Sequence, residues 1–117
     1  MNKIIEEVFS VSKNIRYVAV YLNGVLESKQ RNDLNSASSS ESDKYEELIV
    51  NPTMLKLVTQ RGNIDCGGAQ YVIVRYGNFY QLVYHVKGGH ISVSIELDPD
   101  LLKLVEEIKN IVDKKVN

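Results

Sequence analysis

The chain has 117 residues, of which 44% are hydrophobic and 25% are charged, and its formal net charge is −1. These values are ordinary for a globular protein, and the length predicts a single domain, residues 1–117, with one hydrophobic core. Lys and Arg are spread along the chain without a net excess, whereas binding to nucleic acid is dominated by basic side chains that neutralise phosphates. Nucleic acid is therefore not an expected partner.

Cysteine usage and hydropathy bear on the compartment. Cys66 is the single cysteine, so no internal disulfide can form and nothing indicates an oxidising environment. No apolar run reaches transmembrane length. Glu6 and Glu7 interrupt the N-terminal stretch where a signal peptide would need continuous apolar residues. We expect a cytoplasmic protein with no membrane partner.

The N-terminal part of the chain predicts a helix followed by a β-hairpin. Apolar residues recur at helical spacing over residues 2 to about 13. Residues 16–22 are apolar on both sides and rich in β-branched and aromatic side chains, which predicts a central strand covered on two faces. Asn23-Gly24 is a strong signal for a two-residue turn. Residues 25–31 then become polar quickly, as expected of an edge strand guarded by charges.

The middle of the chain contains a serine-rich segment and then a helical region. Residues 32–42 predict a flexible loop by their composition. Residues 43–61 carry apolar side chains typical of a helix, and Ser42 or Asp43 is a suitable N-cap. We expect this helical region to cover one face of the sheet.

Two residues limit this helical region. Pro52 either kinks one continuous helix or begins a second helix as its first residue. Gly62 is expected to end the helix, so residues 62–68 are expected to form a loop that leads into the sheet.

Residues 69–97 predict three antiparallel strands joined by two tight turns. Gly77-Asn78 and Gly88-Gly89 are the turn signals, because two-residue hairpin loops need the positive φ that Gly and Asn adopt readily. These turns place Tyr76 opposite Phe79 and Lys87 opposite His90. Side chains then alternate between two faces of the sheet. The core face carries Tyr71, Ile73, Tyr80, Leu82, Tyr84, Val86, Ile91, Val93, Ile95 and Leu97.

The other face of this meander is apolar only towards its first strand. An apolar patch of this kind needs cover from a helix or from another molecule. Its members are Val72, Val74, Tyr76, Phe79 and Val83.

Asp98-Pro99 predicts the start of a C-terminal helix, with Asp98 as the N-cap and Pro99 as the first helical residue. A one-sided apolar stripe then continues to the end of the chain. Its members are Leu101, Leu104, Val105, Ile108, Ile111 and Val112.

No constellation in the sequence predicts catalysis. His85 and His90 share one face of a hairpin, but a metal site needs a third ligand that the sequence does not place. Both are therefore interpreted as surface histidines. Cys66 has no predicted base beside it, and Glu46 and Glu47 are interpreted as part of a solvated helix face. We expect a protein that is not an enzyme and that uses no cofactor or metal.

The order of elements is helix, strand, strand, helix, strand, strand, strand, helix. This order, the segment IRYVAVYLNGVLES at residues 15–28, and the meander followed by DPDLLKLVEEI at residues 98–108 resemble the Roadblock-type domain. That family includes the dynein light chain of that name and bacterial and archaeal regulators of small GTPases. Residues 15–28 are also similar to the opening of an archaeal set of related domains.

The resemblance implies an α+β fold, an αββαβββα three-layer sandwich of the profilin-like kind. Its five-stranded antiparallel sheet would have the order 2-1-5-4-3. The second helix would lie on one face, and the first and last helices on the other.

The resemblance also implies a homodimer, because family members commonly pair the third strand and the second helix across a two-fold axis. Here these are residues 70–76 and 43–61. Residues 70–76 lack proline and, apart from Arg75, inward charges, and such an edge invites strand addition. The expected interface residues are Tyr71, Val72, Ile73, Val74, Tyr76, Met54, Leu55 and Val58.

Two functional hypotheses follow. The leading one is a non-enzymatic homodimeric interaction module, a scaffold or regulator whose other partner is a small GTPase or another protein. The alternative is a small-ligand sensor of the profilin-like or PAS-like kind. It requires a pocket between the sheet and residues 43–61, lined by Tyr17, Tyr21 and Met54.

Overall fold

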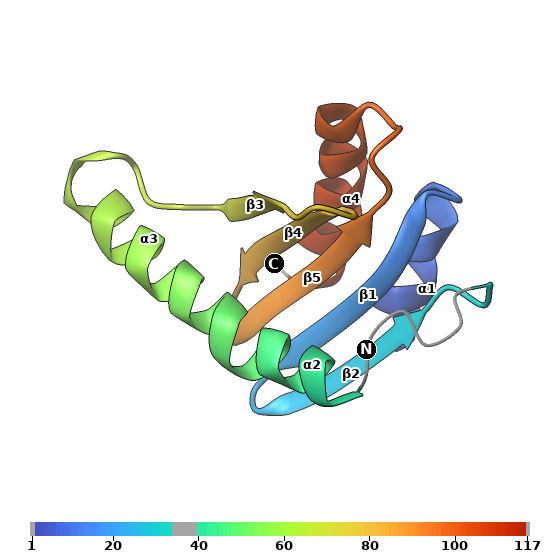
Figure 1. The fold of residues 1–117 in the computed structure, drawn as a ribbon. Coiled ribbons are helices and arrows are strands. Elements are labelled where there is room, and N and C mark those ends of the chain that lie inside the picture. Colours follow the sequence, from blue (N-terminus) through green and yellow to red (C-terminus); the bar gives the residue numbers. More distant parts are fainter. Residues whose placement is uncertain (1, 34–39, 117) are drawn as a thin grey trace.

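A twisted antiparallel sheet with helices on both faces makes up the molecule (Figure 1). The computed structural model describes residues 2–33 and 40–116. The strand order is β2-β1-β5-β4-β3, which confirms the expected α+β sandwich and its sheet order. The strands are β1 (Ile15–Leu22), β2 (Val25–Gln30), β3 (Tyr71–Arg75), β4 (Tyr80–Val86) and β5 (Gly89–Ile95). The helical elements are α1 (Asn2–Val11), α2 (Ser40–Tyr45), the π-helical turn η1 (Glu46–Val50), α3 (Asn51–Asp65) and α4 (Leu101–Lys115).

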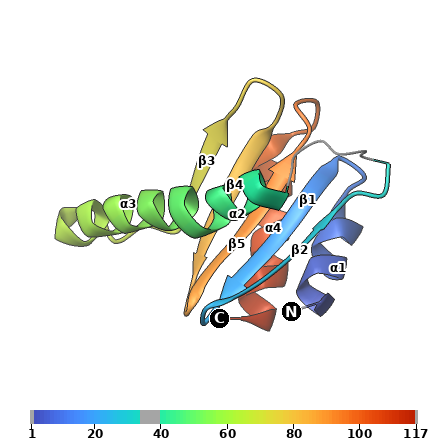
Figure 2. The same cartoon turned by 60° about the horizontal axis from the view of Figure 1, so that its bottom comes forward.

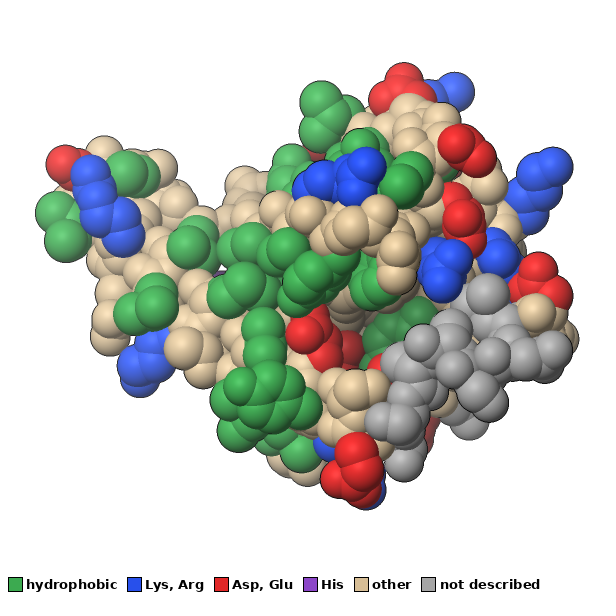
Figure 3. Space-filling model, viewed as in Figure 1, with side chains coloured by type: hydrophobic (Ala, Val, Ile, Leu, Met, Phe, Trp, Pro, Cys, Tyr) green, Lys and Arg blue, Asp and Glu red, His purple; other side chains and the backbone are tan. Residues whose placement is uncertain are grey.

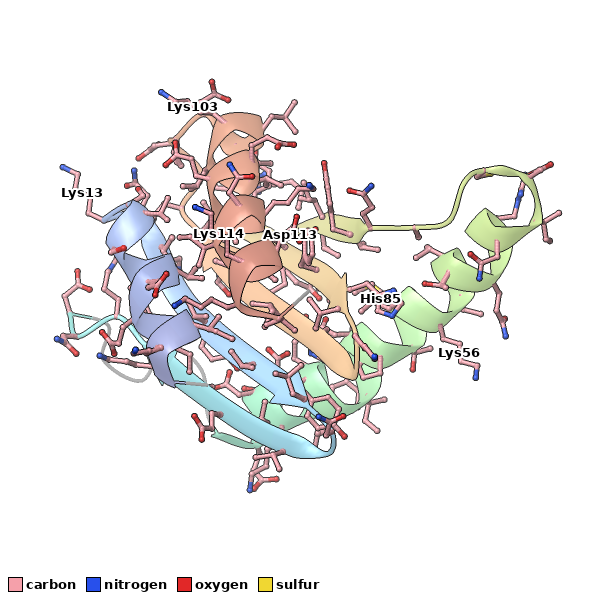
Figure 4. All side chains as sticks on the ribbon, turned by 180° about the vertical axis from the view of Figure 1, so that it is seen from behind. Lys13, Lys56, His85, Lys103, Asp113 and Lys114 are labelled. Atoms are coloured by element: carbon pink, nitrogen blue, oxygen red, sulfur yellow. The ribbon has the colours of Figure 1, made fainter. Side chains whose placement is uncertain are left out.

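Helices α1 and α4 lie side by side on one face of the sheet and enclose the core (Figure 4). The predicted apolar stripe of α4 faces inwards, with Leu104, Val105, Ile108 and Val112 buried. The helix begins later than expected. Asp100, not Asp98, is its N-cap, and the Asp100 side chain accepts a hydrogen bond from a backbone N–H of the first turn. Pro99 therefore lies in the turn before the helix.

The first hairpin has the expected Asn23-Gly24 turn. Asn23 and Gly24 both have positive φ, 52° and 85°, and Leu22 lies opposite Val25. Both residues can adopt this region at low cost, which is why the dipeptide closes a tight hairpin. Strand β1 pairs with β2 and β5, and its central residues are buried on both faces.

The turn between β4 and β5 differs from the expected one. Lys87-Gly88 forms the two-residue loop, so Val86 lies opposite Gly89 and His85 opposite His90. Gly88 takes the positive φ of 90° that the turn requires. The register has moved by two residues, so every side chain keeps its predicted face. The Gly77-Asn78 turn has the expected register, with Arg75 opposite Tyr80.

The second helical region is one continuous run with a wide turn just before Pro52. Helix α2 passes through the π-helical turn η1 into α3, and Pro52 stands in the first turn of α3. A proline has no N–H to donate and its ring crowds the carbonyl one turn earlier, so a local widening of the helix accommodates it. The run begins at Ser40, so Ser42 and Asp43 lie inside it and do not cap it. Residues 34–39 of the serine-rich segment lie outside the described residues.

Gly62 is an internal residue of α3 rather than its end, so the expected loop over residues 62–68 is shorter. The chain folds back on this glycine: the N–H groups of Cys66 and Gly68 donate to its carbonyl at 2.9 and 3.0 Å. A Cβ on Gly62 would lie 2.7 Å from the carbonyl carbon of Gly68. Glycine is needed there for close approach, not for an unusual φ.

The helical run crosses the second face of the sheet, and the far half of α3 projects beyond β3 (Figure 2). Leu55 is buried against the sheet, whereas the rest of α3 towards Asp65 is mostly exposed. Within residues 2–33 and 40–116, no helix is long and apolar enough to cross a membrane.

Candidate functional site

A buried acidic centre lies between the helical run and the sheet. Glu47 of η1 is fully buried, and four side chains surround its carboxylate. The hydroxyls of Tyr17 and Ser92 donate to Oε2 at 3.1 and 2.9 Å. The Asn51 amide donates to Oε1 at 3.0 Å, and His90 Nε2 lies 2.8 Å from the same oxygen. A buried carboxylate needs hydrogen-bonding partners of this kind, because burial removes the water that would otherwise solvate it.

The sequence interpretation of two of these residues was wrong. Glu47 was placed on a solvated helix face and His90 on the surface, yet they are 0% and 1% exposed. His85, directly opposite His90, does remain exposed beside α3 (Figure 4). Glu47 and His90 are buried because the helical run covers this part of the polar sheet face. The polar residues there therefore hydrogen bond with each other.

The polar face of β5 offered a signal for this centre. His90, Ser92 and Ser94 alternate with core residues, and all three are buried. Ser94 donates to Gln81 at 2.5 Å, and Gln81 also hydrogen bonds Ser92. Polar side chains that alternate along a central strand will be buried if a helix covers that face of the sheet. Because buried polar groups are hydrogen-bonded, such a pattern predicts polar partners on the covering helix. Burial, and then the charge of Glu47, raise the pKa of the Tyr17 phenol.

Beside this centre is a cavity of about 460 Å³, open on the face seen in Figure 3, where acidic side chains lie in a hollow. It is bounded by α2 and η1, by β1 and by the β3–β4 turn. Among its lining residues are Arg16, Tyr17, Asp43, Glu46, Tyr76 and Phe79.

Glu46 faces this cavity with little compensation for its charge. The Tyr76 hydroxyl donates to its two carboxylate oxygens at 3.2 and 3.4 Å. In the described part of the chain, no Lys, Arg or His lies within ion-pair distance of Glu46. Burial raises the pKa of Glu46, with smaller contributions from Glu47 and Asp43, while the Tyr76 hydrogen bond opposes the shift.

We expect Glu46→Gln to stabilise the protein near neutral pH. A carboxyl group whose pKa is raised in the folded state disfavours folding once it is ionised, so its removal should help above that pKa. The gain should disappear as the pH falls below the usual glutamate pKa of about 4.3, where both states hold the proton. Urea-unfolding midpoints of both proteins across this pH range would measure it, and a variant that is less stable at neutral pH would contradict it.

The ligand-sensor hypothesis requires one pocket between the sheet and the helical run, and the described residues form two separate cavities there. Tyr17 lines the cavity described above, whereas Tyr21 lines a second cavity of about 390 Å³ with Leu55, His85 and His90. Met54 is half-buried on α3.

An exposed apolar surface runs along the same helical run, and Figure 3 shows hydrophobic side chains along α3 and over β3. The apolar residues of η1 and α3 are not confined to one side of the helical run, and in the part of the chain that the structure describes several of them are exposed. We call these residues the outer helix face. They are Leu48, Ile49, Leu57, Val58 and Ile64, with exposures of 43%, 53%, 62%, 38% and 75%.

The predicted interface residues are only partly on this surface. Val58 belongs to it, but Leu55 is buried beneath α3. Tyr71, Val72, Ile73 and Val74 are half-buried in β3, the last strand of the sheet, and Tyr76 is half-buried in the turn that follows. Leu57 and Ile64 are exposed on this surface but are not among the predicted interface residues, because a projecting helix cannot be recognised from residue spacing alone.

Cys66 and a possible metal site are the two remaining candidates for chemistry. Cys66 is exposed, and its thiol accepts a hydrogen bond from Arg61 at 3.3 Å and donates one to Asp65 at 3.2 Å. Over residues 2–33 and 40–116, no group of three or more His, Cys, Asp and Glu side chains is placed to hold a metal ion.

Known proteins resemble this chain in structure but not detectably in sequence. Neither a protein-family model nor a curated protein matches the sequence. The Roadblock/LC7 domain from Streptomyces avermitilis matches 97% of this chain over 92% of its own length, with a TM-score of 0.75 and 13% identity.

Other solved structures agree with this match. MglB in a tetrameric arrangement has a TM-score of 0.71 and 13% identity, covering 97% of this chain and 82% of its own. MglB from Thermus thermophilus, a gliding protein, has a TM-score of 0.63 and 16% identity, covering 94% and 81%. Together with the strand order, these matches show that the chain has the Roadblock/LC7 fold.

Proposed function

We propose that this chain is a non-enzymatic interaction module that forms a homodimer through β3 and the outer helix face. The observation that carries the proposal is the projection of α3 beyond the sheet, with large aliphatic side chains exposed, beside β3, the last strand of the sheet in the described residues. Exposed apolar surface of this extent on a small domain marks an interaction site.

The edge of β3 supports a sheet-forming contact. Its five residues, Tyr71–Arg75, contain no proline, and Arg75 is their single charge. An edge strand without such protection pairs readily with another strand. Two copies related by a two-fold axis would join their sheets through β3, and each would present its outer helix face to the other.

The test is absolute mass in solution, measured by light scattering across a concentration series. We expect twice the 13.3 kDa of the chain. The double variant Leu57→Asp/Ile64→Asp should reduce the mass to that of the monomer, because each aspartate would be desolvated at the interface. Leu102→Asp is the matched control, since Leu102 is a 66% exposed leucine on the opposite face. A wild-type monomer, or a double variant that stays dimeric, would contradict the interface.

We further propose a small GTPase as the class of the second partner, which the Roadblock resemblance implies. The test uses purified small GTPases from the source organism, loaded with GDP or with a non-hydrolysable GTP analogue. Co-elution with the chain in size-exclusion chromatography is expected in one nucleotide state. Failure of all of them to co-elute, with the dimer intact, would remove this partner class without affecting the proposed interface.

A further inference from the structure

We infer that the 460 Å³ cavity between the α2–η1 segment and the β3–β4 turn binds a small organic cation through a guanidinium or primary ammonium group. This site lies on the same side of the sheet as the outer helix face but does not depend on the dimer. The size falls within the range of pockets that hold small molecules.

The charge around the cavity favours a cation. Of the described lining residues, Asp43, Glu46 and Glu47 are acidic and Arg16 is basic. Arg16 is already engaged, because its guanidinium lies 2.8 Å from Glu96. Glu47 is satisfied by its four neighbours, whereas the Glu46 carboxylate accepts hydrogen bonds from the Tyr76 hydroxyl and, among the described residues, has no Lys, Arg or His within ion-pair distance. A cation placed there would gain a charge-assisted hydrogen bond in a partly desolvated setting.

The aromatic lining selects an organic cation. Tyr17, Tyr76 and Phe79 contribute to the wall, and the rings of Tyr76 and Phe79 are 5.4 Å apart between centroids. Aromatic faces attract ammonium and guanidinium groups within about 6 Å. The protein itself shows this contact at the cavity wall, where the Arg16 guanidinium lies 5.5 Å from the centre of the Phe79 ring.

The raised pKa of Glu46 agrees with this assignment. Burial of the Glu46 carboxylate raises its pKa, because the ionised form is held partly out of water and no Lys, Arg or His of the described residues pairs with it. A bound cation would restore the missing partner, so the cost in the empty state becomes affinity in the bound state. Glu46→Gln is therefore expected to raise the stability of the protein and to weaken its binding of the cation.

The test is an NMR titration of the full chain with agmatine, which carries both a guanidinium and a primary ammonium group. Saturable shifts are expected at the amides of Glu46, Tyr76 and Asn78. Glu46→Gln should weaken agmatine binding about tenfold, the loss of one charge-assisted contact. N-butylurea, a neutral analogue of the guanidinium end, should not produce these shifts.

Two controls keep the result interpretable. Glu107→Gln removes an exposed carboxylate from α4 on the opposite face and should change the affinity by less than about twofold. Tyr76→Phe keeps the ring but removes the hydroxyl, so it should retain most of the binding, and a loss as large as that caused by Glu46→Gln would contradict the assignment of the cation to the carboxylate. An absence of saturable shifts, or equal weakening by Glu46→Gln and Glu107→Gln, would overturn the inference.

A second titration with the tripeptide Gly-Arg-Gly separates the two sources of such a cation. Tighter binding of the tripeptide than of agmatine would assign the cavity to an arginine side chain of a protein partner. Tighter binding of agmatine would assign it to a free ligand. Light scattering on the same samples reports the oligomeric state, so failure of the proposed dimer and failure of the cation site are distinguished.

Discussion

Replacement of Gly89 by alanine is expected to lower the free energy of unfolding by more than about 4 kcal/mol, a loss that few single substitutions cause. Gly89 lies in β5 opposite Leu22 of β1. A Cβ there would lie 1.8 Å from the carbonyl oxygen of Tyr21 and 2.8 Å from its carbonyl carbon. Because the obstacle is backbone of a central strand, the β1–β5 pair would have to separate locally to accept one methyl group.

Gly77→Ala is the matched control for this experiment. Gly77 stands in the other turn of the meander, its φ is not in the left-handed region, and nothing lies within 4 Å of a Cβ built there. Its replacement should change the stability by less than about 1 kcal/mol. Urea unfolding followed by circular dichroism compares the two variants. Equal stabilities would mean that β1 does not approach Gly89 as closely as described.

The same glycine shows where sequence reasoning stops. Gly88-Gly89 was expected to form the two-residue loop, but the loop is Lys87-Gly88, and the two glycines serve different purposes. Gly88 supplies the positive φ of the turn, whereas Gly89 makes room for a strand that is distant in the sequence, at Leu22. Spacing cannot reveal the second purpose, because it depends on which strand becomes the neighbour. The predicted faces survived because the error was two residues, the period of a strand.

The layers were predictable because their patterns are local. The stripe of α4, the alternation in β4 and β5 and the Asn23-Gly24 turn each specify one element, and all of them agree with the observed sheet. Helix ends were less predictable. Gly62 looked like a stop, yet α3 continues to Asp65 and uses that glycine for a close backbone contact.

The acidic centre was missed for a related reason. His90, Ser92 and Glu47 are polar, and polar residues on the outer face of a hairpin or on a helix normally face solvent. Here the helical run lies on the polar part of the sheet face, so both sets of polar side chains are buried together. The sequence predicted the helix above this face but not that it would meet the sheet through hydrogen bonds.

Loss of the Glu47 carboxylate should therefore cost far more than its position on a helix would indicate. We expect Glu47→Ala to lower the free energy of unfolding by about 3 kcal/mol or more, the range measured when one partner of a buried pair is removed. The substitution leaves the Tyr17 and Ser92 hydroxyls, the Asn51 amide and the His90 ring without their shared partner. Each buried polar group that loses its hydrogen bond adds to the cost.

Two comparison variants separate this network from general effects of substitution in the helix. Glu41→Ala removes an exposed carboxylate from α2 and should cost less than about 1 kcal/mol. Glu47→Gln keeps the shape and two hydrogen-bonding atoms, so its stability should fall between those of the wild type and Glu47→Ala. If Glu47→Ala were no more destabilising than Glu41→Ala, Glu47 would face solvent, and the helical run would not be fastened to β1 and β5 by this carboxylate. A large loss that is halved in a background already lacking His90 would instead show that the carboxylate and the imidazole act as one coupled pair.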